Sequence, residues 1–173
     1  MRRMRGLTLL ELVITLAVLS IALGLGVPAA RHVMDSVRAT TSLHQLTASL
    51  AIARNAAVTY RQPVTLCPSR DGASCLDGTD WSEGWIAYRD PLRQDAPATA
   101  ADVLRRFDPQ HPTLRLTTST GRPRVRYLPN GSAAGTNASF RLCRRSGALL
   151  GIVVVANSGR ARRERPSANA ACS

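Results

Sequence analysis

The sequence predicts an α+β protein, in which one long N-terminal helix is followed by an antiparallel β-sheet head. Three observations support this class. An apolar run covers residues 7–30, helically spaced apolar residues follow it, and short β-branched and aromatic runs alternate with turn residues beyond Pro63. The 173 residues fit one main domain, and a hydrophobic content of 45% supplies a buried core. Wholesale disorder is therefore excluded.

The first thirty residues combine a basic end with the apolar run. Residues 1–5, MRRMR, precede 24 residues (7–30) in which Glu11 is the single charged side chain. A helix of 24 residues is about 36 Å long, enough to cross a hydrocarbon core of about 30 Å. Basic residues before such a helix favour a cytoplasmic N-terminus. A secretory signal peptide cleaved near 27–29, a plain membrane anchor and a prepilin leader all fit this pattern.

Glu11 favours the prepilin leader, because a carboxylate inside lipid costs a few kcal/mol unless it has a partner. The segment RGLTLLEL, residues 5–12, resembles the prepilin peptidase site of type IV pilins. The resemblance implies cleavage by prepilin peptidase between Gly6 and Leu7, followed by N-methylation of Leu7. It also implies a role for Glu11 in filament assembly, where the carboxylate meets the N-terminal amine of a neighbouring subunit. Leu7 departs from the usual Phe or Met of the family.

Beyond the apolar run the pattern becomes amphipathic. Five apolar residues recur at spacings of three and four, which places them on one helical face: Leu43, Leu46, Leu50, Ala53 and Ala57. We expect the helix to reach about Tyr60 and to stop before Pro63. Strands are expected at 64–67, 85–89, 103–107, 113–117, 124–128, 139–143 and 151–156.

The expected organisation has four parts. They are a leader peptide at 1–6, a transmembrane and filament-core helix at 7–30, an amphipathic helix at 31–62, and a β-rich head with an arginine-rich C-terminal tail at 63–173.

Segments of the expected head resemble the FimT/GspH group of type IV pilin-like proteins. They are PVTLCPSRDGASC (63–75), DWSEGWIAYRD (80–90), FRLC (140–143) and IVVVANSGRARR (152–163). The resemblance implies a type IV pilin-like fold, assembly with other pilin subunits and a single-pass inner-membrane location with the head in the periplasm. Assembly would then carry the subunit into an extracellular pilus. FimT-type members are minor pilins, some of which bind DNA in natural transformation, whereas GspH-type members are minor pseudopilins of type II secretion.

The four cysteines are expected to form disulfides, because an exported head lies in an oxidising compartment. Three connectivities are possible. We favour Cys67–Cys75, which closes a local loop, together with Cys143–Cys172, which ties the tail to the sheet. The cysteine spacing does not suit a zinc site, and no nucleophile elbow, P-loop or HExxH motif occurs in the sequence. We therefore expect no metal, no cofactor and no enzymatic activity.

Positive charge is concentrated in the C-terminal third. All 23 basic residues are arginine, and the formal net charge is +12. Residues 115–173 hold eleven arginines and one acidic residue, Glu164, hence +10, whereas residues 7–114 hold nine arginines and ten acidic residues. Such an asymmetry indicates a polyanionic partner, for which DNA is the leading candidate.

Two arginine clusters are candidate DNA-binding segments. The cluster at 159–165 contains Gly159-Arg160-Ala161-Arg162, which matches the Gly-Arg-x-Arg motif that DNA-binding FimT proteins carry near the C-terminus. Guanidinium groups match phosphate oxygens geometrically, and a preceding glycine allows close backbone approach. The candidate DNA-binding residues are Gly159, Arg160, Arg162, Arg163, Arg165, Arg122, Arg124, Arg126, Arg144 and Arg145.

Two alternatives to these sites remain open. The tail could be a solvated basic segment that aids solubility or touches anionic lipid, and the arginines at 122–126 could pair with the acidic residues of 71–95. The predicted function is a minor type IV pilin that binds extracellular DNA non-specifically through C-terminal arginines and supports DNA uptake in natural transformation. The alternative is a GspH-type minor pseudopilin with a structural role in the type II secretion filament.

Overall fold

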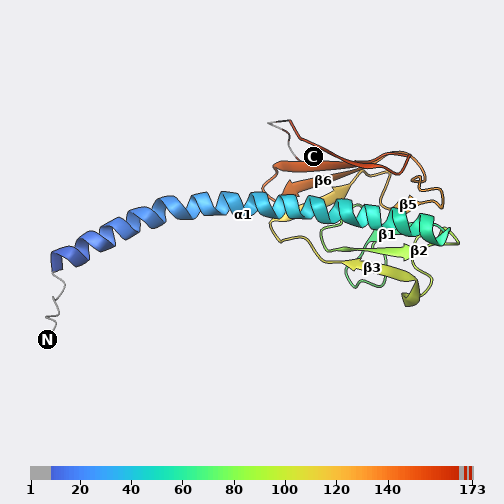
Figure 1. Cartoon of the computed structure of the whole chain (residues 1–173), viewed down its shortest axis with the longest axis horizontal. Coiled ribbons are helices and arrows are strands. Elements are labelled where there is room, and N and C mark those ends of the chain that lie inside the picture. The colour runs from blue at the N-terminus through green and yellow to red at the C-terminus, as the bar shows by residue number, and fades with distance from the viewer. Residues whose placement is uncertain (1–8, 168–169, 171, 173) are drawn as a thin grey trace. The chain divides into compact units, whose positions relative to one another are not determined.

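The structure is a computed structural model that describes residues 9–167, 170 and 172, except for the side chains of residues 25–32. The chain divides into two compact units, which meet in the sequence between Arg38 and Ala39. In the described part of the chain, helix α1 (Leu9–Tyr60) is followed by eight strands and a short 3-10 helix, η1 (Ala100–Asp102) (Figure 1). The α+β architecture predicted from the sequence is confirmed.

The first unit contains the N-terminal part of α1. Its large apolar side chains from Leu9 to Leu23 are all exposed, and Glu11 lies in the first turn of the helix. Among the described residues, no helix combines the length and the apolar character that crossing a membrane requires. Gly6 and Leu7, the predicted site of cleavage and methylation, lie outside the described residues.

The part of α1 in the second unit supplies one wall of the hydrophobic core. The predicted stripe is confirmed, because Leu46, Leu50, Ala53 and Ala57 are completely buried and Leu43 nearly so. The helix ends at Tyr60, and Arg61 follows with a φ of 52°. A residue in the left-handed region commonly terminates a helix, and Pro63 prevents its continuation.

Two four-stranded antiparallel sheets make up the rest of the second unit. The first has the order β3-β2-β1-β5, from β1 (Val64–Pro68), β2 (Trp85–Arg89), β3 (Val103–Phe107) and β5 (Val125–Tyr127). The second has the order β4-β6-β7-β8, from β4 (Leu114–Thr118), β6 (Ala138–Arg144), β7 (Leu149–Val155) and β8 (Ala161–Glu164). Seven of these strands overlap the predicted ones, and β8 was not predicted.

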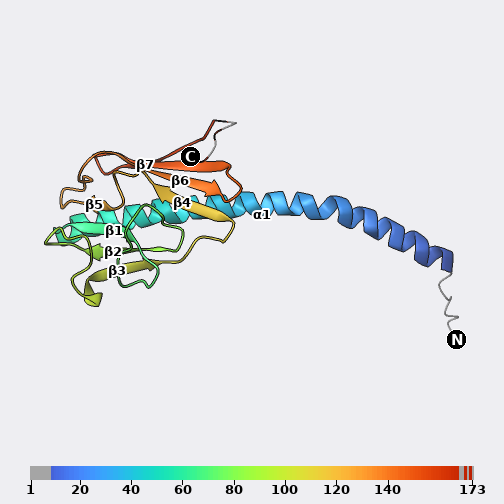
Figure 2. The ribbon, with the colours of Figure 1, turned by 180° about the vertical axis from the view of Figure 1, so that it is seen from behind.

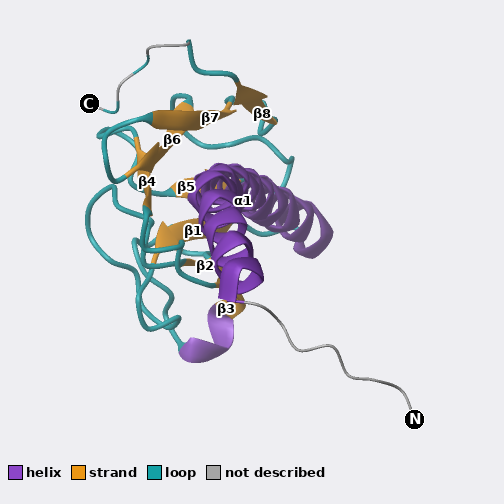
Figure 3. Cartoon of the chain, turned by 90° about the vertical axis from the view of Figure 1, so that its left-hand side faces the viewer, coloured by secondary structure: helices purple, strands orange, loops and turns teal. Residues whose placement is uncertain are grey.

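The sheets lie on different sides of the helix within the second unit. Viewed along α1, β7 and β8 lie on one side of it, and β1 to β3 lie on another (Figure 3). The buried aromatic rings of Trp81 and Phe140 contact each other edge to face, with 4.9 Å between the ring centroids. The ring of Trp85 stacks on that of Phe107, with 5.6 Å between the centroids. The indole N–H of Trp85 donates to Ser49 Oγ of α1 at 3.0 Å, so helix and sheet also share a buried hydrogen bond.

Two disulfides, one local and one between distant residues, stabilise the second unit. The structure contains Cys67–Cys75 and Cys143–Cys172, the pairing that we favoured from the sequence. The first closes the loop after β1, and its Cys67 packs beside Ile86 and Tyr88. The second attaches the C-terminal segment to β6, where the Cys172 N–H also donates to Gly147 O at 2.9 Å. The described residues contain no cluster of side chains suited to a metal ion.

Candidate functional site

Residues 161–164 of the arginine segment 159–165 form an edge strand, β8. Strand β8 pairs with β7 in the register Val155↔Ala161 to Ile152↔Glu164. Ala161 packs against the core, while the three following side chains are exposed. We expected these arginines in a tail beyond the last strand, and the structure corrects this. One edge of the valine-rich strand β7 is free to pair with another strand. The backbone of residues 161–164 pairs with this edge, although the side chains of 161–164 do not alternate between apolar and polar.

Gly159 lies in the turn between β7 and β8 and has a structural role. Its φ is +80°, and a Cβ atom at this position would lie 1.9 Å from the carbonyl oxygen of Gly131. Arg54 of α1 donates from Nε to the same oxygen at 2.8 Å and from Nη2 to Ser158 O at 3.3 Å. Because Gly159 has no side chain, the turn that contains it can pack against the turn that contains Gly131 and against helix α1. From the sequence we had expected this glycine to allow close approach of a ligand.

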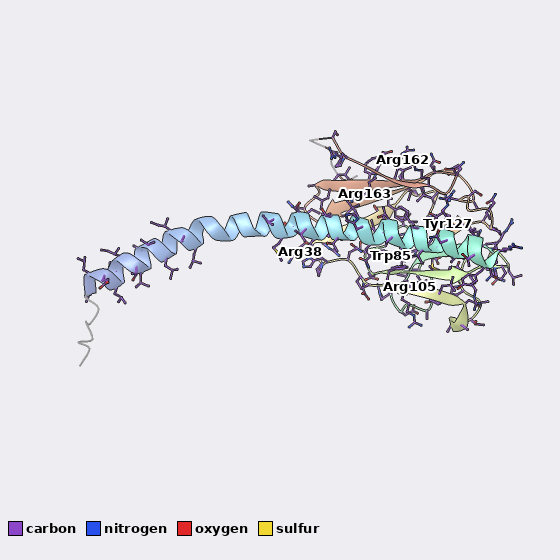
Figure 4. The ribbon with its side chains drawn as sticks, in the orientation of Figure 1. Arg38, Trp85, Arg105, Tyr127, Arg162 and Arg163 are labelled. Atoms are coloured by element: carbon purple, nitrogen blue, oxygen red, sulfur yellow. A yellow bond between two sulfur atoms is a disulfide. The ribbon has the colours of Figure 1, made fainter. Side chains whose placement is uncertain are left out.

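The arginines of β8 project to both sides of the strand, because successive side chains alternate. Arg162 shares one side with Glu164, and its Nε lies 2.9 Å from Glu164 Oε1. Arg163 lies on the other side, with Nη1 at 3.4 Å from Nε2 of His44 on α1 (Figure 4). Arg160 and Arg165 are exposed, and neither has an ion-pair partner within the described part of the chain.

The segment 160–165 therefore presents four guanidinium groups and one carboxylate. The Arg162–Glu164 pair is open to solvent, with side-chain exposures of 57% and 41%. An exposed pair of this kind contributes about 0–1 kcal/mol. A phosphate group can therefore compete with Glu164 for Arg162.

Arg126, from the other predicted cluster, forms a buried polar network. Its Nε lies 2.7 Å from Asp90 Oδ2 and 3.1 Å from Thr65 Oγ1, and its Nη2 donates to Gln94 O at 2.9 Å. The side chain of Asp90 is only 2% exposed. A buried carboxylate requires such partners, so Arg126 balances the charge of Asp90.

Arg124 and Arg122 are also held by intramolecular contacts. Arg124 lies between Asp77 at 3.3 Å and Asp95 at 3.7 Å, and its own side chain is 18% exposed. Arg122 donates to Thr136 O, and burial lowers the pKa of its guanidinium. Arg124 and Arg126 therefore pair with acidic residues of 71–95, which is the alternative that the sequence left open. We therefore remove the arginines of 122–126 from the candidate DNA surface.

Arg144 and Arg145 lie at the end of β6 and in the turn before β7, away from the β7–β8 turn. They line a cavity of about 780 Å³ together with Arg115 of β4 and Arg141 of β6. Arg115 and Arg141 were not among the residues predicted from the sequence. A signal was present, because each arginine stands between two apolar residues in the patterns LRL and FRL and so faces away from the core.

Comparison with known families identifies the chain. Residues 42–159 match the family described as type II transport protein GspH. The chain belongs to this family. Residues 1–27 of this GspH-family protein match the prokaryotic N-terminal methylation motif. No curated protein matches the sequence significantly.

Solved structures confirm the pilin-like fold. The minor pilin FimU of Pseudomonas aeruginosa PAO1 is 20% identical and gives TM-scores of 0.56 and 0.58 in two crystal forms. These alignments cover 74% of this chain and 97% and 92% of the FimU chains. The minor pseudopilin EpsH of the Vibrio cholerae type 2 secretion system is 13% identical, with a TM-score of 0.53 over 75% of this chain and 98% of EpsH. At these identities the comparison establishes the fold alone.

Proposed function

We propose that this GspH-family protein is a minor type IV pilin that binds extracellular DNA non-specifically through the C-terminal arginines in and beside strand β8, and that it supports DNA uptake in natural transformation. One observation carries the proposal. Four of the six residues from Arg160 to Arg165 are arginines on an exposed sheet edge, and their single acidic neighbour forms only a solvent-exposed pair. Exposed guanidinium groups suit the phosphate oxygens of a nucleic-acid backbone.

The composition favours binding without sequence preference. Phosphate contacts by arginine release counterions and carry no base information. Aromatic residues make up only 4% of the chain, and Trp81 and Trp85 are buried, so exposed rings on which bases could stack are scarce. The chain would therefore hold DNA by charge, and no catalysis by this protein is needed.

The leader supplies the proposed route into a filament. Prepilin peptidase would cleave between Gly6 and Leu7, and methylation of Leu7 would follow. Residues 7–30 would hold the protein in the inner membrane with its head in the periplasm, and Glu11 would guide assembly with other pilin subunits. The match of residues 1–27 to the N-terminal methylation motif supports this route.

DNA affinity of the full-length protein in mild detergent tests the proposal. We expect the Arg160→Ala/Arg165→Ala variant to bind a labelled duplex of arbitrary sequence at least tenfold more weakly than wild type. Its plot of log affinity against log salt should be shallower by about 1.8, because each lost phosphate contact removes about 0.9 from the slope. Fluorescence anisotropy at several salt concentrations measures both quantities.

A matched control removes the same charge elsewhere. Arg105 and Arg106 of β3 are exposed on the first sheet, so Arg105→Ala/Arg106→Ala lowers the net charge equally. This control should retain nearly wild-type affinity. Equal losses in the two variants, or undiminished affinity after Arg160→Ala/Arg165→Ala, would refute the assignment to the arginines of 160–165.

The family match also supports a second candidate, a GspH-type minor pseudopilin with a structural role in a type II secretion filament. The family description and the similarity to EpsH favour it. Deletion of the gene separates the two candidates. Loss of transformation with intact protein secretion supports the DNA-binding pilin, and loss of secretion with intact transformation supports the pseudopilin.

A further inference from the structure

Helix α1 contacts the turn that leads into the C-terminal arginines. Arg54 of α1 donates from Nε to Gly131 O at 2.8 Å and from Nη2 to Ser158 O at 3.3 Å. The C-terminal part of α1 therefore lies beside the loops that follow β5 and β7 (Figure 2). We propose that Arg54 is a positioning residue, which holds the β7–β8 turn so that Arg160 is presented to DNA. This role rests on the DNA-binding function proposed above.

The β7–β8 turn sets the backbone from which Arg160 projects. Within the turn, Gly159 N–H donates to Ala156 O at 2.8 Å, and Ala156 N–H donates to Arg160 O at 3.0 Å. Gly159 is buried, whereas Arg160, which follows it directly, is exposed. A displacement of the turn would therefore move Arg160 relative to the arginines of β8. A contact that fixes the turn also fixes the starting point of the Arg160 side chain.

The same guanidinium group also holds the turn that follows β5. Gly131 lies in this turn and is buried, and its N–H donates to Leu128 O at 2.8 Å. A buried carbonyl group needs a donor within the fold, and Arg54 Nε is a donor to Gly131 O. Ala133 N–H donates to Asn157 O at 2.9 Å, which joins the two turns directly. Helix α1 and the two turns are therefore linked by hydrogen bonds.

Close packing around Arg54 leaves the turns little freedom. A Cβ atom on Gly159 would lie 3.1 Å from Arg54 Nε, and a Cβ atom on Gly131 would lie 3.4 Å from the same nitrogen. The planar guanidinium group directs its two donors at two carbonyl oxygens at once. A lysine ammonium is a compact charge on a flexible stem and lacks this planar fork. Arginine at position 54 therefore restricts the turns in a way that lysine does not.

A fixed turn favours binding because it is ordered before the ligand arrives. Ordering a mobile loop at an interface costs affinity, and a preorganised loop avoids that cost. Arg54 is half-buried, and its Nε and Nη2 already donate to carbonyl oxygens. Its contribution to DNA binding is therefore made through the turn and not through a phosphate contact. Loss of Arg54 should lower affinity and leave the number of phosphate contacts unchanged.

Amide hydrogen exchange of the full-length protein in mild detergent tests the positioning in the absence of DNA. Arg54→Met keeps much of the apolar stem and removes the donors. We expect exchange at the Ala133 and Gly159 amides to become several-fold faster in this variant, while exchange in the central strand β6 stays as in wild type. The matched control Arg105→Met removes one exposed positive charge from β3 and should leave both turn amides unchanged.

Fluorescence anisotropy with a labelled duplex tests the consequence for binding. We expect Arg54→Met to bind several-fold more weakly than wild type, with an unchanged slope of log affinity against log salt. A direct phosphate contact by Arg54 would instead lower that slope by about 0.9. Arg54→Lys keeps the charge and one donor for Gly131 O, so it covers the case in which Arg54→Met fails to fold. It should restore only part of the lost affinity, because the fork is missing.

The positioning role is overturned by any of three results in folded variants. They are unchanged exchange at the turn amides, wild-type DNA affinity in both Arg54→Met and Arg54→Lys, and a slope lowered by about 0.9 in Arg54→Met. Failure of the DNA-binding function gives a different result, undiminished affinity in Arg160→Ala/Arg165→Ala. Reduced affinity in that double variant together with wild-type affinity in the Arg54 variants refutes the positioning role alone.

Discussion

Replacement of Arg126 by methionine should destabilise the fold and leave the DNA surface intact. Methionine keeps much of the apolar stem of arginine and removes the guanidinium donors. Asp90, whose side chain is 2% exposed, then loses the donor at 2.7 Å. Unpairing a buried charge costs about 3–5 kcal/mol. Asp90 keeps hydrogen bonds from the Thr65 hydroxyl at 2.6 Å and the Gln94 N–H at 2.6 Å.

We therefore expect the lower end of that range, a loss of about 3 kcal/mol in the free energy of unfolding. For a folded unit of this size the loss corresponds to a fall in melting temperature of about 10 °C. Urea unfolding of the full-length protein, followed by circular dichroism, measures the free energy. Asp90→Asn alone and combined with Arg126→Met completes a double-mutant cycle, in which we expect a coupling of about 2 kcal/mol.

Arg162→Met is the matched control, because it breaks an exposed arginine–carboxylate pair. Its effect should stay below about 1 kcal/mol. The reasoning is refuted if Arg126→Met costs less than 1 kcal/mol relative to wild type. If folded Arg126→Met lost as much DNA affinity as Arg160→Ala/Arg165→Ala, Arg126 would have to be counted among the DNA-binding residues.

Three further predictions concern single residues of the second unit. Gly159→Ala should lower the free energy of unfolding by at least about 2 kcal/mol, because of backbone strain at positive φ and the clash with Gly131 O. Gly78→Ala, at a φ of +99° with open space around it, shows the strain alone, so similar losses in urea unfolding would argue against the clash. Tyr127→Phe removes a buried hydroxyl that has no hydrogen-bond partner among the described residues. It should leave the free energy of unfolding unchanged or raise it by up to about 1 kcal/mol. A loss above about 1 kcal/mol would show that the hydroxyl has a partner. Burial raises the pKa of Tyr88 and of Tyr127 to about 12 from the usual 10, so the folded state binds these protons more tightly. The contribution of the two protonated phenols to the free energy of unfolding is present below pH 10 and is lost as the pH rises towards 12. Phenolate absorbance should therefore show two of the three tyrosines ionising well above pH 10. Ionisation of all three near pH 10 would contradict this prediction.

The arginines show where sequence reasoning succeeded and where it stopped. The excess charge of the C-terminal third and the Gly-Arg-x-Arg pattern located Arg160 to Arg165 on the chain. They did not reveal that residues 161–164 form an edge strand, because Ala161 is the one residue of β8 that packs against the core. Pattern methods detect a strand by the alternation of buried and exposed side chains, and that alternation is absent here.

The same limit explains the residues that were assigned differently or overlooked. Arg124 and Arg126 look alike in sequence to the arginines of β8, yet their neighbours in space are Asp77, Asp95 and Asp90. Arg115 and Arg141 lie 26 positions apart, and only the pairing of β4 with β6 brings them to one face. The charge pattern of the sequence does not distinguish an arginine that pairs with carboxylates within the fold from one that is exposed to a ligand.

The sequence by itself determined most of the secondary-structure elements of this protein. Local periodicity specified the buried stripe of α1 and seven strands, because this signal depends on near neighbours. An oxidising compartment predicted that the four cysteines form disulfides, and the structure decided among the three possible connectivities in favour of the one we preferred. The tertiary structure decided which charges are neutralised within the fold and which remain exposed. Ion pairing acts over a few ångströms in space, and the fold sets those distances between residues far apart in the chain.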